Sequence, residues 1–247
     1  MIIIRTPFRV TLGGGGTDLL SYYSKFGGFI FSFTLNKYMF INVNRPSVDQ
    51  LIRVKYSESE TVENVSDLNH EIARACLVKL GITKNIEISS MADLPAGSGL
   101  GSSSTYTVGL LNALHYLKRD HIPLGELAEE ACEIEINILS KPMGKQDQYL
   151  AAYGGFLVMD IAKNGHVKVR NAKIDISTLN NLKRNLLIFY TGKQRINKKI
   201  LRKQDNATKN QNRDVLNSLH YIKDSGYKIL EIVESGNITE LGKMFDE

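Results

Sequence analysis

The 247-residue sequence predicts an α+β (mixed α/β) protein. Two observations support this fold class. Runs rich in β-branched and aromatic residues recur through about the first 190 residues and are typical of strands. Segments with apolar residues at helical spacing separate these runs, and a polar helical pattern continues from about residue 196 to the last residue. We therefore expect a mixed N-terminal part followed by a helical C-terminal part, with the boundary near residues 170–185.

The expected strands begin at the first residue of the chain, where the apolar run Met1–Leu12 enters four consecutive glycines. Further strands are expected wherever β-branched and aromatic residues gather. In order, the strands lie within residues 1–12, 27–46, 51–59, 85–93, 156–161, 166–174 and 185–192.

The expected helices show apolar residues three and four positions apart. They lie within residues 67–82, 102–118, 123–139, 141–155 and 196–247, the last with a break at 235–237. Asp67 or Asn69 is the expected N-cap of the first helix, and Gly81 marks its end. Pro123 begins the third, because proline suits the first turn of a helix.

The composition is that of an ordinary globular protein, with 43% hydrophobic and 23% charged residues. No window approaches 18 consecutive apolar residues, and the apolar N-terminus lacks the basic region and cleavage site of a signal peptide. We expect neither a membrane span nor a membrane partner. Cys76 and Cys132 lie in helical patterns outside any CxxC pair, which favours buried thiols in a reducing compartment. These features predict a cytoplasmic protein.

The formal net charge of +5 is concentrated in one segment. Lys193–Lys209 carries seven Lys/Arg and one Asp, a local charge of +6, so the rest of the chain sums to about −1. A solvated helix face and a binding surface both explain such a patch. An RNA-binding module is a weak alternative, because the patch contains no aromatic residues on which bases could stack. We expect no nucleic-acid partner.

A loop rich in glycine and serine, LPAGSGLGSSS (Leu94–Ser104), leads into the helix expected at 102–118. Glycines let backbone N–H groups face an anion, and the following helix offers the positive end of its dipole. The hydroxyls of Ser102–Ser104 can bind phosphate oxygens or magnesium. The Walker A motif and the dinucleotide fingerprint are absent, and no lysine stands where Walker A requires one. Taken alone, the residues of this loop are equally consistent with an anion-binding site and with a plain tight turn.

Two further segments carry candidate chemistry. In PFRVTLGGGGTDL (Pro7–Leu19), Arg9 and Asp18 flank four glycines, which suggests a very close approach of the backbone to another group. A flexible loop is the alternative. Glu135 and Asp147 lie twelve residues apart, on a helix and on the turn after it. Buried acids of this kind can serve as metal ligand and general base, although either acid alone is more simply a surface charge.

These three segments, in the order in which they follow one another along the chain, resemble the GHMP kinases. This family includes galactokinase, homoserine kinase, mevalonate kinase and phosphomevalonate kinase. LPAGSGLGSSS matches the family signature P-x-x-x-G-L-G-S-S, PFRVTLGGGGTDL resembles the first motif, and EIEINILSKPMGKQDQ has the spacing of E…P-x-G-x-x-D-Q. Within the family, GGGGTDL, KYMFINVN, GKQDQYLAAYGG and LLIFYTG are most similar to the D-glycero-D-manno-heptose 7-phosphate kinases. The resemblance covers essentially the whole chain.

The resemblance implies a two-domain fold. Residues 1–180 would form a ribosomal-protein-like N-terminal domain that binds ATP, and residues 181–247 would begin a C-terminal domain. The active site would lie between the two. The third, glycine-rich motif of the family is not found after Gly192. We therefore expect the C-terminal domain to be incomplete, and residues 1–247 alone to have little activity.

The resemblance also implies roles for individual residues. Asp147 and Arg9 would be catalytic, and Glu135 with Ser103 would bind Mg²⁺. The phosphates of ATP would lie against Pro95, Gly97, Ser98, Gly99, Leu100, Gly101, Ser102, Ser103 and Ser104. The sugar would contact Gly15, Gly16, Thr17 and Asp18. Lys193 and Arg195 follow the last expected strand and are candidates for binding a phosphate already on the sugar; the exposed start of a basic helix is the alternative.

The implied activity is ATP- and Mg²⁺-dependent phosphorylation of the anomeric hydroxyl of D-glycero-D-manno-heptose 7-phosphate, giving the 1,7-bisphosphate. ATP and the sugar phosphate are the expected partners. Another sugar kinase of the family, of the fucose or galactose type, is an open alternative, because a sugar pocket is built from scattered residues. The second open alternative is a truncated, non-catalytic relative that binds sugar or nucleotide.

Overall fold

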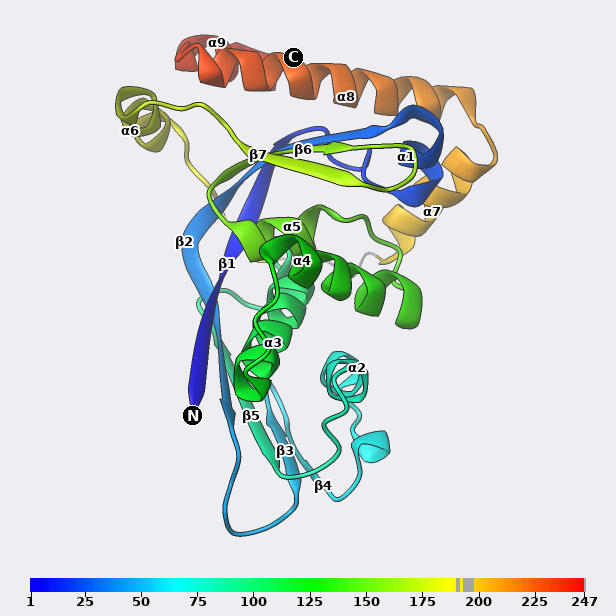
Figure 1. Ribbon diagram of the computed structural model, residues 1–247. Helices are drawn as coiled ribbons and strands as arrows, with labels where there is room; N and C mark the ends of the chain where they lie inside the picture. Colours follow the sequence, from blue (N-terminus) through cyan, green and yellow to red (C-terminus); the bar gives the residue numbers. More distant parts are fainter. Residues whose placement is uncertain (190–191, 193–197, 247) are drawn as a thin grey trace. The chain divides into compact units, whose positions relative to one another are not determined.

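The computed structural model of the protein describes residues 1–189, 192 and 198–246 (Figure 1). It has the mixed α/β architecture that the sequence predicts. The chain forms two compact units with interleaved sequence segments. The first comprises Met1–Arg9, Thr34–Lys141 and Asp147–Gly154, and the second Val10–Phe33, Pro142–Gln146 and Gly155–Glu247. The domain division at residue 180 stays a prediction.

Two long strands, β1 and β2, contribute residues to both units. The strands are β1 (Ile2–Gly13), β2 (Gly28–Asn44), β3 (Ile52–Lys55), β4 (Ser59–Val62), β5 (Ile86–Ala92), β6 (Phe156–Ile161) and β7 (Val167–Asn171). The α-helices are α1 (Leu20–Phe26), α2 (Glu71–Lys79), α3 (Ser102–Lys118), α4 (Leu124–Cys132), α5 (Gln146–Tyr153), α6 (Ile176–Asn185), α7 (Lys198–Lys209), α8 (Arg213–Glu234) and α9 (Ile238–Asp246). A 3₁₀ turn (Val65–Asp67) precedes α2, and a π-helical segment (Glu133–Ile138) follows α4.

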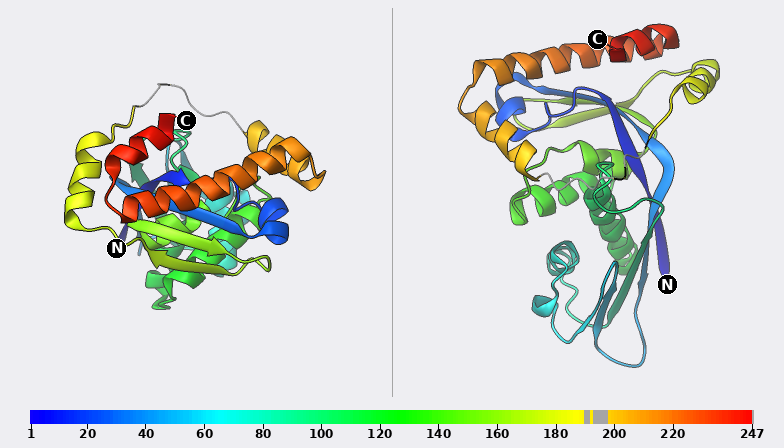
Figure 2. Two further views of the ribbon diagram at one scale, coloured as in Figure 1. Left: turned by 90° about the horizontal axis from the view of Figure 1, so that it is seen from above. Right: turned by 180° about the vertical axis from the view of Figure 1, so that it is seen from behind.

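The first unit is a sheet with helices α2 and α3 on one face (Figures 1 and 2). β3 pairs antiparallel with β4 and parallel with β5, and β5 pairs antiparallel with the second half of β2. Alternate residues of these strands are buried, such as Ile52 and Val54, because successive side chains point to opposite faces. They form one core with apolar residues of α3, such as Leu110. This core anchors α3, whose first turn follows the glycine–serine loop.

The second unit contains β6 and β7, which belong to the same sheet as β3, β4 and β5. β6 pairs antiparallel with the first half of β2 and with β7, and α8 lies across these strands (Figure 2). Their core includes Phe31 of β2, Val158 of β6 and Val233 of α8. The end of β1 packs tightly on α8, since a Cβ atom on Gly13 would lie 2.5 Å from the Cα of Gly226. A larger residue at either position would push the strand and helix apart.

The strand expected at residues 185–192 is wrong in the part that the structure describes. Helix α6 occupies residues 176–185, and the Asp175 carboxylate caps it by accepting a hydrogen bond from the Thr178 N–H (2.6 Å). Residues 186–189 have no regular structure, and Leu187 and Phe189 are exposed. β-propensity depends on packing against neighbours, so an apolar run alone does not make a strand. Residues 190 and 191 lie outside the described residues. The patterns also missed the short elements α1 and β4.

Other expectations are confirmed. Helix α3 spans the expected residues 102–118, and the break at 235–237 separates α8 from α9. The helix expected at 123–139 is α4 continued by the π-helical segment. Cys76 and Cys132 are buried and form no disulfide. Burial raises the pKa of the Cys76 thiol, which suits an unreactive core residue.

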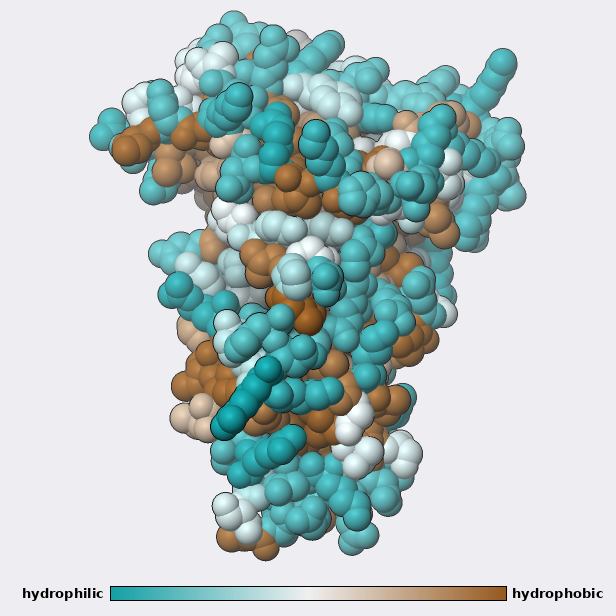
Figure 3. Space-filling model, viewed as in Figure 1, coloured by the Kyte–Doolittle hydropathy of each residue, from teal (hydrophilic) through white to brown (hydrophobic). Residues whose placement is uncertain are grey.

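The surface mixes polar and apolar side chains. Figure 3 shows hydrophilic side chains over most of one face, with smaller hydrophobic patches between them. Exposed apolar residues such as Val48 and Met91 come from separate segments of the chain. Among the described residues, no helix is both long and apolar enough to span a membrane.

Candidate active site

The glycine–serine loop leaves β5 and ends at the N-terminus of α3. Gly97, Gly99 and Gly101 all have positive φ values, between 76° and 83°, which side chains rarely adopt. Gly101 is the N-cap of α3, and a Cβ atom there would lie 3.4 Å from the Asp147 carboxylate and 3.5 Å from Arg9 Cγ. The loop therefore needs glycine for its backbone conformation and for its close approach to these two side chains.

Arg9 and Asp147 form the centre of the site. Arg9 Nε and Nη2 each lie 2.7 Å from Asp147 Oδ1, and Nη1 donates to the Gly99 carbonyl at 3.0 Å. The side chains of Arg9 and Asp147 are only 13% and 14% exposed. The Arg9 N–H also donates to the Leu100 carbonyl at 3.3 Å. The Arg9 guanidinium thus links the loop to Asp147 of α5.

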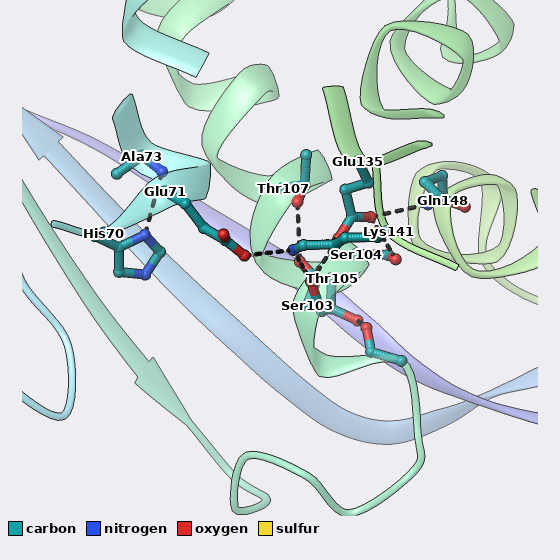
Figure 4. Close-up of polar contacts among 11 residues, drawn as sticks. His70, Glu71, Ala73, Ser103, Ser104, Thr105, Thr107, Glu135, Lys141 and Gln148 are labelled. Carbon is teal, nitrogen blue, oxygen red and sulfur yellow. Dashed lines mark hydrogen bonds and ion pairs between the residues drawn. The ribbon is translucent and has the colours of Figure 1, made fainter. Parts of the chain in front are cut away.

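Glu135 is the buried centre of a second cluster, shown in Figure 4. Its Oε1 accepts a hydrogen bond from the Ser103 hydroxyl, and its Oε2 accepts from the Ser104 hydroxyl (2.6 Å) and from Gln148 Nε2 (2.8 Å). The π-helical segment brings Glu135 to this position; such segments recur at functional sites. Ser104 is fully buried, so its hydroxyl serves this carboxylate within the protein.

The residues fit the Mg²⁺ ion that the family resemblance implies. Ser103 Oγ and Glu135 Oε1 are hard oxygen donors in direct contact, and Mg²⁺ prefers such ligands. Lys141 Nζ already lies beside both, 2.9 Å from Ser103 Oγ and 3.4 Å from Glu135 Oε1, so this position attracts positive charge. Within the described residues, no group of three or more His, Cys, Asp or Glu could hold a metal. Mg²⁺ would therefore need nucleotide phosphates to complete its ligands, which is its usual mode of binding.

A cavity of about 730 Å³ opens beside the loop. Its walls include Pro95, Gly97 and Ser103 of the loop region, His70 of the α2 start, and Tyr106 of α3. The volume lies in the range of small-molecule sites. The Tyr106 hydroxyl is buried and has no hydrogen-bond partner among the described residues. Buried polar atoms without partners are rare in proteins, so this atom favours a ligand or water in the cavity.

The loop holds a second such atom. The Ser98 hydroxyl is buried and also lacks a partner in the described part of the chain. A nucleotide at this loop would supply phosphate acceptors for it. The fit to ATP therefore rests on the glycine backbone, the adjoining cavity and an unused hydroxyl.

His70 is the N-cap of α2, so the expectation of Asp67 or Asn69 is wrong. Its Nδ1 accepts a hydrogen bond from the Ala73 N–H at 3.2 Å, which requires a neutral ring protonated on Nε2. Burial lowers the pKa of His70 from its ordinary value of 6.5, against a smaller opposing effect of Glu60. A histidine ring can cap a helix, but the standard N-cap preferences do not point to it.

We expect His70 to make folding stability fall as the pH drops below about 6.5. A group whose pKa is lower in the folded state contributes stability above its unfolded pKa and loses it as the pH falls through the folded pKa. His70→Asn keeps a good N-cap that does not titrate. Its urea midpoint should therefore change less between about pH 7 and pH 5 than that of the wild type. Equal pH sensitivity of the two proteins would contradict this role.

The glycine run in the second unit approaches the backbone of the protein itself. A Cβ atom on Gly14 would lie 1.9 Å from the Phe29 carbonyl oxygen, which excludes any side chain there. Thr17 is buried, and its hydroxyl lies 2.8 Å from the carbonyl oxygens of Gly14 and Phe29. Thr17 thus holds the loop in shape. Gly15 has no tight neighbour, whereas a Cβ atom on Gly16, at φ 88°, would lie 2.6 Å from Gln204 Nε2 at the end of a side chain.

Asp18 is buried against the segment that precedes Asp147 in the chain. Its Oδ2 accepts a hydrogen bond from the Gln146 N–H at 3.0 Å. A Cβ atom on Gly144 would lie 2.0 Å from the same oxygen, so the G of the P-x-G-x-x-D-Q pattern makes room for Asp18. The conformation of the glycine run before Asp18 is therefore coupled to that of the P-x-G-x-x-D-Q segment.

Lys141 is the main residue of the site that sequence reasoning missed. It follows the π-helical segment and belongs to none of the expected ligand positions, so no motif indicated it. Gln148, beside Asp147, could have been found as the last letter of the D-Q pattern. Lys193 and Arg195 lie outside the described residues, and their role stays a prediction.

Comparisons with known proteins show what the whole chain is similar to. Residues 64–155 match the family model described as GHMP kinases N terminal domain. The chain is 31% identical over 240 residues to the D-glycero-alpha-D-manno-heptose 7-phosphate kinase of Campylobacter jejuni subsp. jejuni serotype O:2, covering 92% of this chain and 70% of the relative. It is 27% identical over 159 residues to a galactokinase of Thermotoga petrophila, covering 61% and 43% of the two chains. The crystal structure of a D-glycero-D-manno-heptose 1-phosphate kinase from Bacteriodes thetaiotaomicron has a TM-score of 0.84 at 25% identity, covering 99% of this chain and 76% of that chain.

Proposed function

The chain belongs to the GHMP kinase family, and we propose that it transfers the γ-phosphoryl group of ATP to the anomeric hydroxyl of D-glycero-D-manno-heptose 7-phosphate. The products are ADP and the 1,7-bisphosphate. The observation that carries the proposal is the contact of Arg9 with both Asp147 and the Gly99 carbonyl, which joins an acid to a phosphate-type loop. The choice of sugar follows the relative that is 31% identical over 92% of this chain.

The proposed chemistry is mostly positioning and charge stabilisation, as in phosphoryl transfer generally. The anomeric oxygen forms a bond to the γ-phosphorus as the bond from that phosphorus to the bridging β-phosphate oxygen breaks. Asp147 orients the hydroxyl and accepts its proton. Arg9, held 2.7 Å from Asp147, stabilises negative charge on the transferring group. Backbone N–H groups of residues 97–101 and the N-terminus of α3 bind the other phosphates.

Glu135 and Ser103 would hold Mg²⁺, which supplies charge neutralisation to the triphosphate when bound. In the second unit, Gly15, Gly16 and Asp18 would line the sugar site, and Thr17 would hold that loop in shape through its contacts with Gly14 and Phe29. Arg195, helped by Lys193, stays the proposed partner of the 7-phosphate on sequence grounds alone.

The test is ADP formation by the full-length protein with MgATP and a panel of sugars. We expect kcat/KM for heptose 7-phosphate to exceed that for unphosphorylated heptose, galactose and fucose by about tenfold or more, the effect of one lost charged contact. A preference for galactose or fucose would replace the proposed substrate by another sugar of the family. Nucleotide binding without turnover on any sugar would favour a non-catalytic binding protein.

Two valine variants control for the loop assignment in the same assay. Gly101→Val places a branched side chain at φ 83° and against Asp147, whereas Gly81→Val meets a similar strain at φ 67° with no atom within 4 Å. Only Gly101→Val should lose ATP binding and turnover. Equal loss in both variants would mean that the effect is general destabilisation.

A further inference from the structure

The loop proposed to bind the nucleotide phosphates contains no lysine of its own, and the structure places one beside it. Lys141 Nζ lies 2.9 Å from Ser103 Oγ, and Ser103 belongs to the loop (Figure 4). We propose that Lys141 is a phosphate-binding residue whose ammonium contacts the triphosphate of the bound nucleotide. This inference rests on the proposed kinase function and names a residue for its nucleotide site.

Lys141 is close enough to the loop for its ammonium to reach a phosphate group bound there. A phosphate oxygen bound by the Ser103 backbone N–H lies about 3 Å from that residue. Since the ammonium is already 2.9 Å from Ser103 Oγ, it can reach the same oxygen with little movement. The side chain is 13% exposed and lines the same cavity as Ser103 and Glu71, the two residues that the ammonium approaches.

The other contacts of the ammonium leave it available. It lies 3.4 Å from Glu135 Oε1 and 3.5 Å from Glu71 Oε1, both longer than the 2.7–2.9 Å typical of charge-assisted hydrogen bonds. Glu135 already accepts hydrogen bonds from Ser103, Ser104 and Gln148. An ammonium carries three donors, so Lys141 can bond a phosphate while it keeps Ser103.

Lys141 carries the positive charge that this cavity offers to a nucleotide phosphate. Among the described residues that line the cavity, it is the only lysine or arginine, and the lowered pKa of His70 keeps that ring neutral at pH 7. Arg9, which is proposed to stabilise the transferring group, does not line this cavity. A compact ammonium suits phosphate as a point charge, the part that a lysine within the loop plays in Walker A proteins.

The experiment measures binding of ATP, ADP and adenosine to the full-length protein by titration calorimetry, with Mg²⁺ and again with EDTA. The variants are Lys141→Met, Lys141→Arg and the control Lys79→Met, which removes a lysine paired with Glu133 at 2.6 Å on α2. We expect Lys141→Met to weaken ATP binding by about tenfold to a hundredfold, with and without Mg²⁺, and to leave adenosine binding unchanged. Lys141→Arg should recover part of the loss, and Lys79→Met should bind as the wild type does.

The nucleoside separates a phosphate contact from a structural role. Weakened binding of adenosine as well as ATP would mean that Lys141 only shapes the site, and would overturn the inference. A loss that disappears in EDTA would also overturn it, because Lys141 would then act only through the metal. Unchanged ATP affinity in Lys141→Met would remove Lys141 from the site and leave the kinase proposal intact. Failure of the wild type to bind ATP would instead contradict the proposed function.

Discussion

Replacing Asp147 by asparagine is expected to lower the turnover number of the full-length protein by about 100-fold or more, within the range of lost acid–base assistance. The amide keeps the size of the side chain but cannot accept the proton of the sugar hydroxyl. It also weakens the contact with Arg9, which now joins a cation to a carboxylate across 2.7 Å. ATP affinity should stay close to normal, because the loop and α3 bind the phosphates. Steady-state kinetics and calorimetry measure the two effects separately.

The matched control is Asp49→Asn. Asp49 pairs with Arg53 at 2.6 Å in the same unit and lines no part of the site, so its loss removes an Asp–Arg pair without touching the chemistry. Its turnover should equal that of the wild type. An Asp147→Asn protein with normal turnover would remove Asp147 from catalysis.

Replacing Glu135 by alanine is expected to destabilise the protein by about 3–5 kcal/mol, the cost of removing one partner from a buried charged cluster. Glu135 is fully buried, and its loss leaves Ser104 and Gln148, both buried, without this acceptor. For a chain of this length the melting temperature should fall by roughly 6–20 °C. Urea unfolding followed by circular dichroism measures the change.

Glu133→Ala tests whether the effect belongs to the cluster. Glu133 lies two residues away in the same π-helical segment, but it is 46% exposed and pairs with Lys79 on the surface. Exposed pairs contribute about 1 kcal/mol or less, so this variant should unfold near the wild-type midpoint. Equal destabilisation by both substitutions would locate the effect in the helix backbone and not in the buried carboxylate.

The local sequence predicted elements wherever short-range chemistry decides them. Helix α3 begins after Gly101 as expected, because glycines at positive φ and an apolar periodicity are local properties. The expectation failed at residues 186–189, where β-propensity indicated a strand but the side chains are exposed. Whether such a run becomes a strand depends on a neighbouring surface, which no short window contains.

The motifs predicted the residues of the candidate site, but only the tertiary structure decided how they meet. Arg9, Gly99 and Asp147 are separated by 138 residues from first to last, yet they form one hydrogen-bonded cluster. The glycine run at Gly13–Gly16 signalled a close approach from sequence, and folding decided that its neighbours are Phe29 and Gly226 of the same chain.

Lys141 marks the limit of the sequence alone. Spacing and residue type determined a glycine–serine loop before a helix, two acids twelve residues apart and an arginine before a glycine run, and they predicted from these a phosphate site. Nothing local distinguishes Lys141 from the other lysines, because its significance lies in its distance from Ser103, 38 residues earlier in the chain. The π-helical segment at Glu133–Ile138 and the packing of α3 on the sheet set that distance. The packing of α3 on the sheet joins distant parts of the chain, so only the folded chain determines which lysine lies beside the loop.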